Sequence, residues 1–98
     1  MIESRVMDHQ EASTLLRSVL AEYRKLPYSQ LASRVGSEDH RNLTGASGAE
    51  YQLEILFRWD HEPGDIVMVM GSIDDGGWRA IVPLSESFLV DPRGAVLG

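Results

Sequence analysis

Apolar residues recur at helical spacing in the first part of the chain and alternate with polar residues later. Between Asp8 and Lys25 they return every three or four positions, which predicts a helix over residues 8–25. Asp8 is a candidate N-cap, and Glu11, three residues later, completes a capping box. Pro27 then ends the helix. The apolar positions of this helix are Ala12, Leu15, Leu16, Val19, Leu20 and Tyr23.

A second, shorter helix is predicted over residues 28–36. Ser29 is its candidate cap, and Gly36 stands where a residue that terminates a helix is expected. The polar segment 37–48 is predicted to be a loop, with a short edge strand near residues 41–44. A helix-turn-helix DNA reader is the functional alternative for the two helices. The acidic chain argues against it, because the second helix carries one basic residue.

The second half of the chain reads as strands. Residues 51–59 alternate between apolar and polar, which predicts a half-buried antiparallel strand. Further strands are predicted over residues 66–73, 78–84 and 88–90, and the Asp-Asp-Gly-Gly sequence at 74–77 predicts a tight hairpin. Helices followed by strands predict a two-layer α+β fold, with N-terminal helices packed on an antiparallel sheet of about four strands.

The hairpin also predicts which residues face each other. Ile73 is expected opposite Trp78 and Val67 opposite Leu84, on an apolar face that packs against the first helix. Gly71 leaves room on this face for an aromatic ring or a helix side chain. Whether the tail after the last strand pairs back on the sheet is left open by the sequence.

The other face of this hairpin is apolar at its centre as well. Met70 is expected opposite Ile81, and Leu56 joins from the preceding strand. One helix layer covers one face of a sheet, so the second face needs a different cover. The alternatives are the chain's own tail or second helix, a second copy, or another protein or small ligand. The candidate interaction face consists of Leu56, Met68, Met70, Arg79 and Ile81.

Length and composition indicate one small domain over residues 1–98, with residues 1–7 a candidate disordered segment. The net charge of −6 disfavours nucleic acid as a partner. The absence of cysteine excludes disulfides and a cysteine nucleophile. The N-terminus has no apolar signal region, and no run approaches the roughly 20 apolar residues of a membrane span. A cytoplasmic protein without a membrane partner is expected.

Candidate chemistry is sparse. Asp74 and Asp75 are adjacent carboxylates, and the glycines after them favour a turn over a metal site. The segment Asp60–Glu62 with Asp65 is a weak candidate for a divalent cation and reads better as a solvated loop. No serine lies in a nucleophile motif, and no phosphate loop or dinucleotide fingerprint is present. We therefore expect no cofactor, no metal and no catalytic residue.

One group of proteins resembles this chain over roughly residues 15–96. The resemblance is to small uncharacterised bacterial α+β proteins that carry the same hairpin run. It implies a bacterial origin and a compact α+β fold, and it implies no activity. The residues that carry it are Tyr51–Glu54, Trp59, Asp60, the run Gly71–Ala80 with its Ile-Asp-Asp-Gly-Gly-Trp-Arg-Ala core, Pro83, Leu84, Phe88 and Gly94.

Three functions from different classes fit these observations. The leading hypothesis is a non-enzymatic interaction protein that forms a homodimer or binds another protein through the second sheet face. The second is a small-ligand-binding or hydrolytic enzyme, with a site near Trp59, Asp60, Asp74 and Arg79. The third is an acidic immunity-type or inhibitor protein that neutralises a basic partner.

Overall fold

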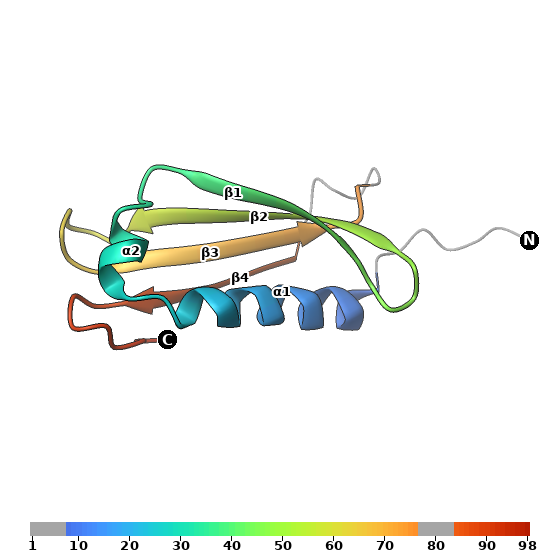
Figure 1. Ribbon diagram of the computed structural model, residues 1–98, viewed down its shortest axis with the longest axis horizontal. Helices are drawn as coiled ribbons and strands as arrows, with labels where there is room; N and C mark the ends of the chain where they lie inside the picture. Colours follow the sequence, from blue (N-terminus) through green and yellow to red (C-terminus); the bar gives the residue numbers. More distant parts are fainter. Residues whose placement is uncertain (1–7, 77–83) are drawn as a thin grey trace, which may run out of the picture.

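Two helices lie on one face of a four-stranded antiparallel sheet in the computed structural model, which describes residues 8–76 and 84–98 (Figure 1). This arrangement confirms the predicted two-layer α+β fold. The strands lie side by side in chain order across the sheet. The elements are α1 (His9–Arg24), α2 (Tyr28–Ala32), β1 (Glu38–Thr44), β2 (Glu50–Trp59), β3 (Val67–Asp74) and β4 (Leu84–Val90).

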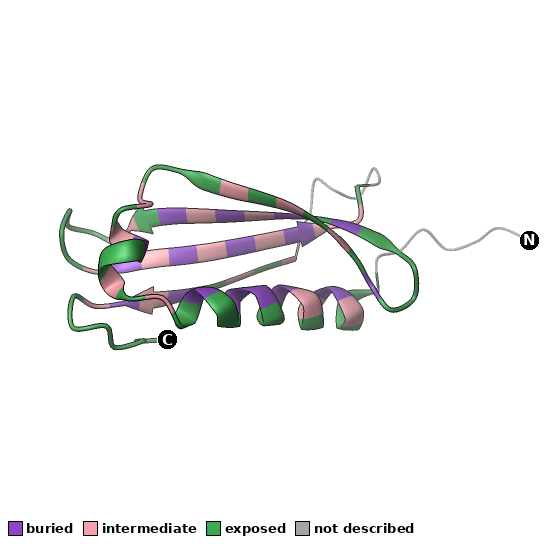
Figure 2. Ribbon diagram, in the orientation of Figure 1, coloured by how far each residue is buried: buried purple, intermediate pink, exposed green. Residues whose placement is uncertain are grey.

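Strict alternation along the two central strands separates the faces of the sheet. Successive side chains of a strand point to opposite faces, and in β2 and β3 every second residue is buried. Figure 2 shows this alternation as bands along both strands. The buried set of these two strands is Tyr51, Leu53, Ile55, Phe57, Val67, Val69 and Ile73. All of it faces the helices, so the hydrophobic core lies between the helix layer and one face of the sheet.

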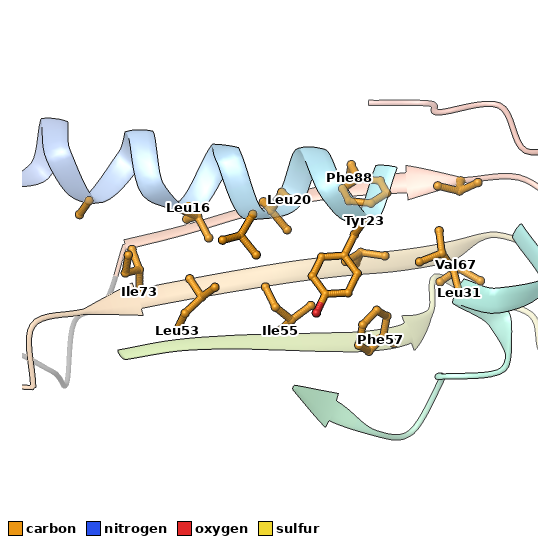
Figure 3. Close-up of a cluster of buried hydrophobic side chains, with 14 of the residues drawn as sticks. Leu16, Leu20, Tyr23, Leu31, Leu53, Ile55, Phe57, Val67, Ile73 and Phe88 are labelled. Atoms are coloured by element: carbon orange, nitrogen blue, oxygen red, sulfur yellow. The ribbon is translucent and has the colours of Figure 1, made fainter. Parts of the chain in front are cut away.

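Gly71 lets α1 approach the sheet closely. A Cβ atom at this position would lie 2.7 Å from Cδ1 of Leu16 and 3.1 Å from Cδ1 of Ile55. The room that the sequence predicted at Gly71 is therefore filled by helix side chains, one of the two expected alternatives. Leu16 and Leu20 project from α1 toward the central strands (Figure 3), and Leu16 is fully buried.

The predicted register of the last hairpin is wrong. Ile73 lies opposite Leu84 and Val67 lies opposite Val90, so the strand that pairs with β3 here is β4. Trp78 and the other expected partners from 77 to 83 lie outside the described residues. A turn dipeptide marks where a chain can reverse. The length of the connection is decided by which apolar residues fill the core, and Phe88 fills it opposite Val69.

The chain between α1 and β2 also differs from the prediction. The second helix ends at Ala32 and not near 36, and its N-cap is Pro27 without a side-chain cap, so Ser29 does not cap it. Gly36 has the expected positive φ of 92°. The expected loop over 37–48 contains the strand β1, which is longer than the predicted edge strand. The sequence of β1 is polar because an edge strand buries few side chains, so its apolar pattern was too weak to predict the whole strand.

The N-terminus of α1 is tied to the loop between β1 and β2. Asp8 accepts a hydrogen bond from the Glu11 amide, as predicted for an N-cap. The Glu11 carboxylate does not complete a capping box and instead accepts bonds from the Ser47 amide, the Ser47 hydroxyl and the Tyr51 hydroxyl. These bonds, the Ser47 amide first, lower the pKa of Glu11. Burial and the same carboxylate raise the pKa of Tyr51 to about 12.

The tail after β4 pairs back on the sheet, which answers the question left open by the sequence. Val96 forms an isolated antiparallel bridge with Val90, and the Leu97 amide donates to the Leu89 carbonyl. The Asp91 carboxylate holds the turn between them by accepting from the amides of Arg93 and Ala95. The tail therefore occupies the outer edge of β4 and lies beside the sheet, not across its face.

Replacing Gly71 with alanine should destabilise the protein. The new methyl group would lie 2.7 Å from Cδ1 of the fully buried Leu16, so the two side chains must shift apart within the core. Overpacking of this kind costs about 1–3 kcal/mol, measured as the free energy of urea unfolding. The double variant Gly71→Ala/Leu16→Ala should lose less stability than the sum of the two single variants. A neutral Gly71→Ala would contradict the close approach of α1.

Tyr51 should make the protein sensitive to alkaline pH. Its folded pKa of about 12 lies above the ordinary value of 10.0. The associated stability is therefore complete below the ordinary pKa and is lost as pH rises toward the folded pKa. Tyr51→Phe should cost about 1 kcal/mol at neutral pH, for one lost hydrogen bond, and should flatten this alkaline loss. Urea unfolding at neutral pH and between the two pKa values measures both effects. An unchanged alkaline loss in Tyr51→Phe would contradict the assignment.

Candidate functional site

The sheet face turned away from the helices is the candidate functional site, and we call it the open face. Neither α1, α2 nor the tail crosses it in the described part of the chain (Figure 1). Residues directly opposite each other in an antiparallel ladder share a face, so the register assigns its members. They are Glu38, His40, Asn42 and Thr44 of β1; Glu50, Gln52, Glu54, Leu56 and Arg58 of β2; Met68, Met70, Ser72 and Asp74 of β3; and Ser85, Ser87 and Leu89 of β4.

Four apolar side chains form a block at one end of the open face. Leu56 lies opposite Met70, and Met68 lies opposite Leu89 one row farther along the strands. All four are half-buried, so each still offers apolar surface to solvent. We call these four residues the apolar block. Methionine side chains adapt their shape to a binding surface, and two of the four are methionines.

The structure brings together part of the predicted interaction face. Leu56, Met68 and Met70 lie together as expected, whereas Arg79 and Ile81 lie outside the described residues. The expected partner of Met70 was Ile81, and its observed partner in β4 is Ser87. Leu89 was missed as a member. Its position next to Phe88 could have revealed it. Phe88 is buried in the core, and neighbouring residues of a strand point to opposite faces.

The two sides of the sheet differ in how their charges are balanced. On the helix side, arginines pair with carboxylates: Arg17 Nε lies 2.8 Å from Glu86, and Arg41 Nη1 lies 3.3 Å from Glu22. Arg34 Nη1 lies 3.4 Å from Asp39 in the same way. Among the described residues, the open face carries one arginine, Arg58, and the four carboxylates of Glu38, Glu50, Glu54 and Asp74.

A cluster of polar side chains lies between α1 and β1, where the helices do not cover the core. The Tyr23 hydroxyl donates to the Asp39 carboxylate and accepts from Arg41 Nη2 at 3.3 Å. Burial, and then the bond to Asp39, raise the pKa of Tyr23, and the bond to Tyr23 raises the pKa of Arg41. Arg34 stacks over the rings of Tyr23 and Phe57. These contacts form a polar cover over this side of the core.

Three residues of the open face have the chemistry to hold a metal ion. The ligand atoms of Glu38, His40 and Glu54 all lie within 4.8 Å of one another. His40 Nε2 lies 2.8 Å from Glu38 Oε1 and 3.8 Å from Glu54 Oε2, so the imidazole contacts both carboxylates directly. The sequence missed this set because it placed Glu38 and His40 in a loop, where i and i+2 residues share no face. The other predicted candidate, Asp60–Glu62 with Asp65, lies in the loop between β2 and β3.

A shallow hollow of about 350 Å³ adjoins the apolar block where β1 begins. Leu56 of the block lines it together with Arg58 and Glu38 of the open face. The remaining lining residues are Val35, Gly36, Ser37, Phe57 and Trp59. The hollow therefore offers apolar walls with a carboxylate and a guanidinium beside them, a combination suited to one large side chain of a partner.

The residues of the predicted enzymatic site do not meet. Trp59 lies opposite Val67 at one end of the β2–β3 pair, and Asp74 lies opposite Gln52 at the other. Seven residues of strand separate the two ends, a distance of about 24 Å. Asp74 accepts a hydrogen bond from the Gly76 amide, as a turn residue does. Arg79 lies outside the described residues.

No family model, curated protein or solved structure matches the chain, so the interpretation of the site depends on its own geometry. Within residues 8–76 and 84–98, neither helix has the length and apolar character needed to cross a bilayer.

Leucines on the two faces of the sheet should differ sharply in their importance for stability. Leu53 is 2% exposed in the core, whereas Leu89 is half-buried on the open face. We expect Leu53→Ala to lower the free energy of unfolding by about 2–5 kcal/mol and Leu89→Ala by less than about 1 kcal/mol. Urea unfolding of the two variants measures this difference. Equal losses would show that the open face is covered as the core is.

Proposed function

We propose that this protein is a non-enzymatic interaction module that binds another protein through the open face. The observation that carries the proposal is the apolar block, which lies on a sheet face that no described element covers. A small protein gains little by exposing two methionines and two leucines together, because apolar groups are more stable away from water. A partner that covers the block would remove this surface from solvent.

The edges of the sheet are poorly suited to binding, which also favours the open face. The tail pairs with the last residues of β4 at its outer edge, through Val96 and Leu97. At the other edge, β1 carries four charged or ionisable residues in succession, Glu38–Arg41. Charged residues on an edge strand oppose the addition of another strand. Recognition by side chains of the open face is therefore favoured over recognition by backbone hydrogen bonds.

A single charge on the open face should abolish binding. Met70 is half-buried within the apolar block and points away from the core. Met70→Glu therefore places a carboxylate in the proposed interface and leaves the packing of the core unchanged. Tagged wild type and Met70→Glu are used to capture proteins from cells that naturally contain the protein. We expect a partner, identified by mass spectrometry, that binds the wild type and is lost with Met70→Glu.

The matched control is Ser18→Glu, which adds the same charge at an exposed position of α1, on the other side of the molecule. It should retain the partner. Circular dichroism and light scattering of all three proteins show whether each is folded and whether it forms dimers. A partner that binds Met70→Glu as well as the wild type, with no change in oligomeric state, would refute a role for the open face.

A further inference from the structure

We infer that the open face binds a basic protein, which inserts an apolar side chain at the apolar block and places lysines or arginines over the carboxylates beside it. This inference depends on the proposed function, because it names the class of partner for the same surface. Two observations support it: the excess of carboxylates on the open face, compared with the paired charges of the helix side, and the small size of the apolar block.

The carboxylates of the open face lack the arginine partners that those of the helix side have. Arg17, Arg34 and Arg41 each pair with a carboxylate on the helix side. On the open face, within the described part of the chain, the side chain that contacts Glu38 and Glu54 is the imidazole of His40. An approaching cation therefore meets carboxylates that no arginine of the described chain neutralises. Opposite potentials on two surfaces speed their association and exclude partners of the wrong charge.

The arrangement of these groups also specifies how the partner must be built. Glu54 lies two residues along β2 from Leu56, or about 7 Å, and Glu50 lies six residues from it, or about 20 Å. Asp74 lies on the neighbouring strand in the same half of the face. A complementary surface has an apolar anchor at one end and cationic side chains extending about 20 Å from it, toward the hairpin between β1 and β2.

A second copy of this chain fits the open face poorly. Two copies that meet only at their apolar blocks bury four half-exposed side chains each, far less than the roughly 800 Å² per partner of a stable interface. Two copies that overlap more fully place the carboxylates of one copy against either the carboxylates or the apolar block of the other, and both arrangements are unfavourable. A larger interface therefore requires a partner with positive charge.

Two synthetic amphipathic helices test the inference. They have equal length and identical leucine positions, and they differ by carrying lysine or glutamate at every polar position. Each is titrated into ¹⁵N-labelled wild-type protein at low and at high salt. We expect the lysine peptide to shift the amide signals of Leu56, Met70 and Glu54, with weaker binding at high salt because salt screens exposed charges. The glutamate peptide should not bind.

Neutral variants test the role of the carboxylates. The double variant Glu50→Gln/Glu54→Gln removes two negative charges from the open face and should weaken binding of the lysine peptide at least about twofold. The control Glu62→Gln/Asp65→Asn removes the same charge from the exposed loop between β2 and β3 and should bind as the wild type does. Both substitutions in each pair are nearly isosteric, and all four residues lie at the surface.

Three outcomes would overturn the inference. Equal binding of both peptides to the open face would show that charge does not select the partner, and it would leave the proposed function standing. Binding of the lysine peptide elsewhere, or no binding of either peptide, would also refute a basic partner at this face. The proposed function itself fails on a separate result, the capture of the same partner by wild type and Met70→Glu.

Discussion

The contact between one helix and two central strands determines the rest of this structure. Leu16 and Leu20 of α1 pack onto β2 and β3 where Gly71 offers no side chain, so the helix lies close to the sheet. Because each strand alternates, this contact commits every second residue of β2 and β3 to the core. The position of α2, which places Leu31 in the same core, and the cover of polar groups over β1 follow from it.

The same contact leaves one face of the sheet uncovered by helices, because a single helix layer covers only one face. The remaining residues of the strands are turned to the other side, where Met68 and Met70 lie with Leu56 and Leu89. A purely solvated face would carry polar residues at these four positions. The half of the face toward the β1–β2 hairpin follows that rule, and the half toward α2 does not. This difference within one face is the basis for proposing that a partner binds at the apolar block.

The charges of the open face indicate which class of partner it would favour. Three arginines of the helix side, Arg17, Arg34 and Arg41, are paired with Glu86, Asp39 and Glu22, so these pairs contribute little net field there. The open face keeps four carboxylates against one arginine among the described residues. A net charge of −6 by itself says only that the chain is acidic. The distribution of this charge around the apolar block is the reason for proposing a basic partner over a second copy of the chain.

The sequence by itself determined α1, β2, β3 and the two-layer α+β class, because strong helical or alternating periodicity reports burial directly. It also placed Leu56, Met68 and Met70 on one face, since strand parity is independent of the partner strand. Tertiary structure alone decided that β3 pairs with residues 84–90, because Phe88 completes the core there, and this pairing brought Leu89 into the apolar block. It also decided that the polar segment 38–44 is an edge strand, which brings His40 between Glu38 and Glu54. Contacts between segments distant in sequence leave no local pattern, and for that reason periodicity could not reveal them.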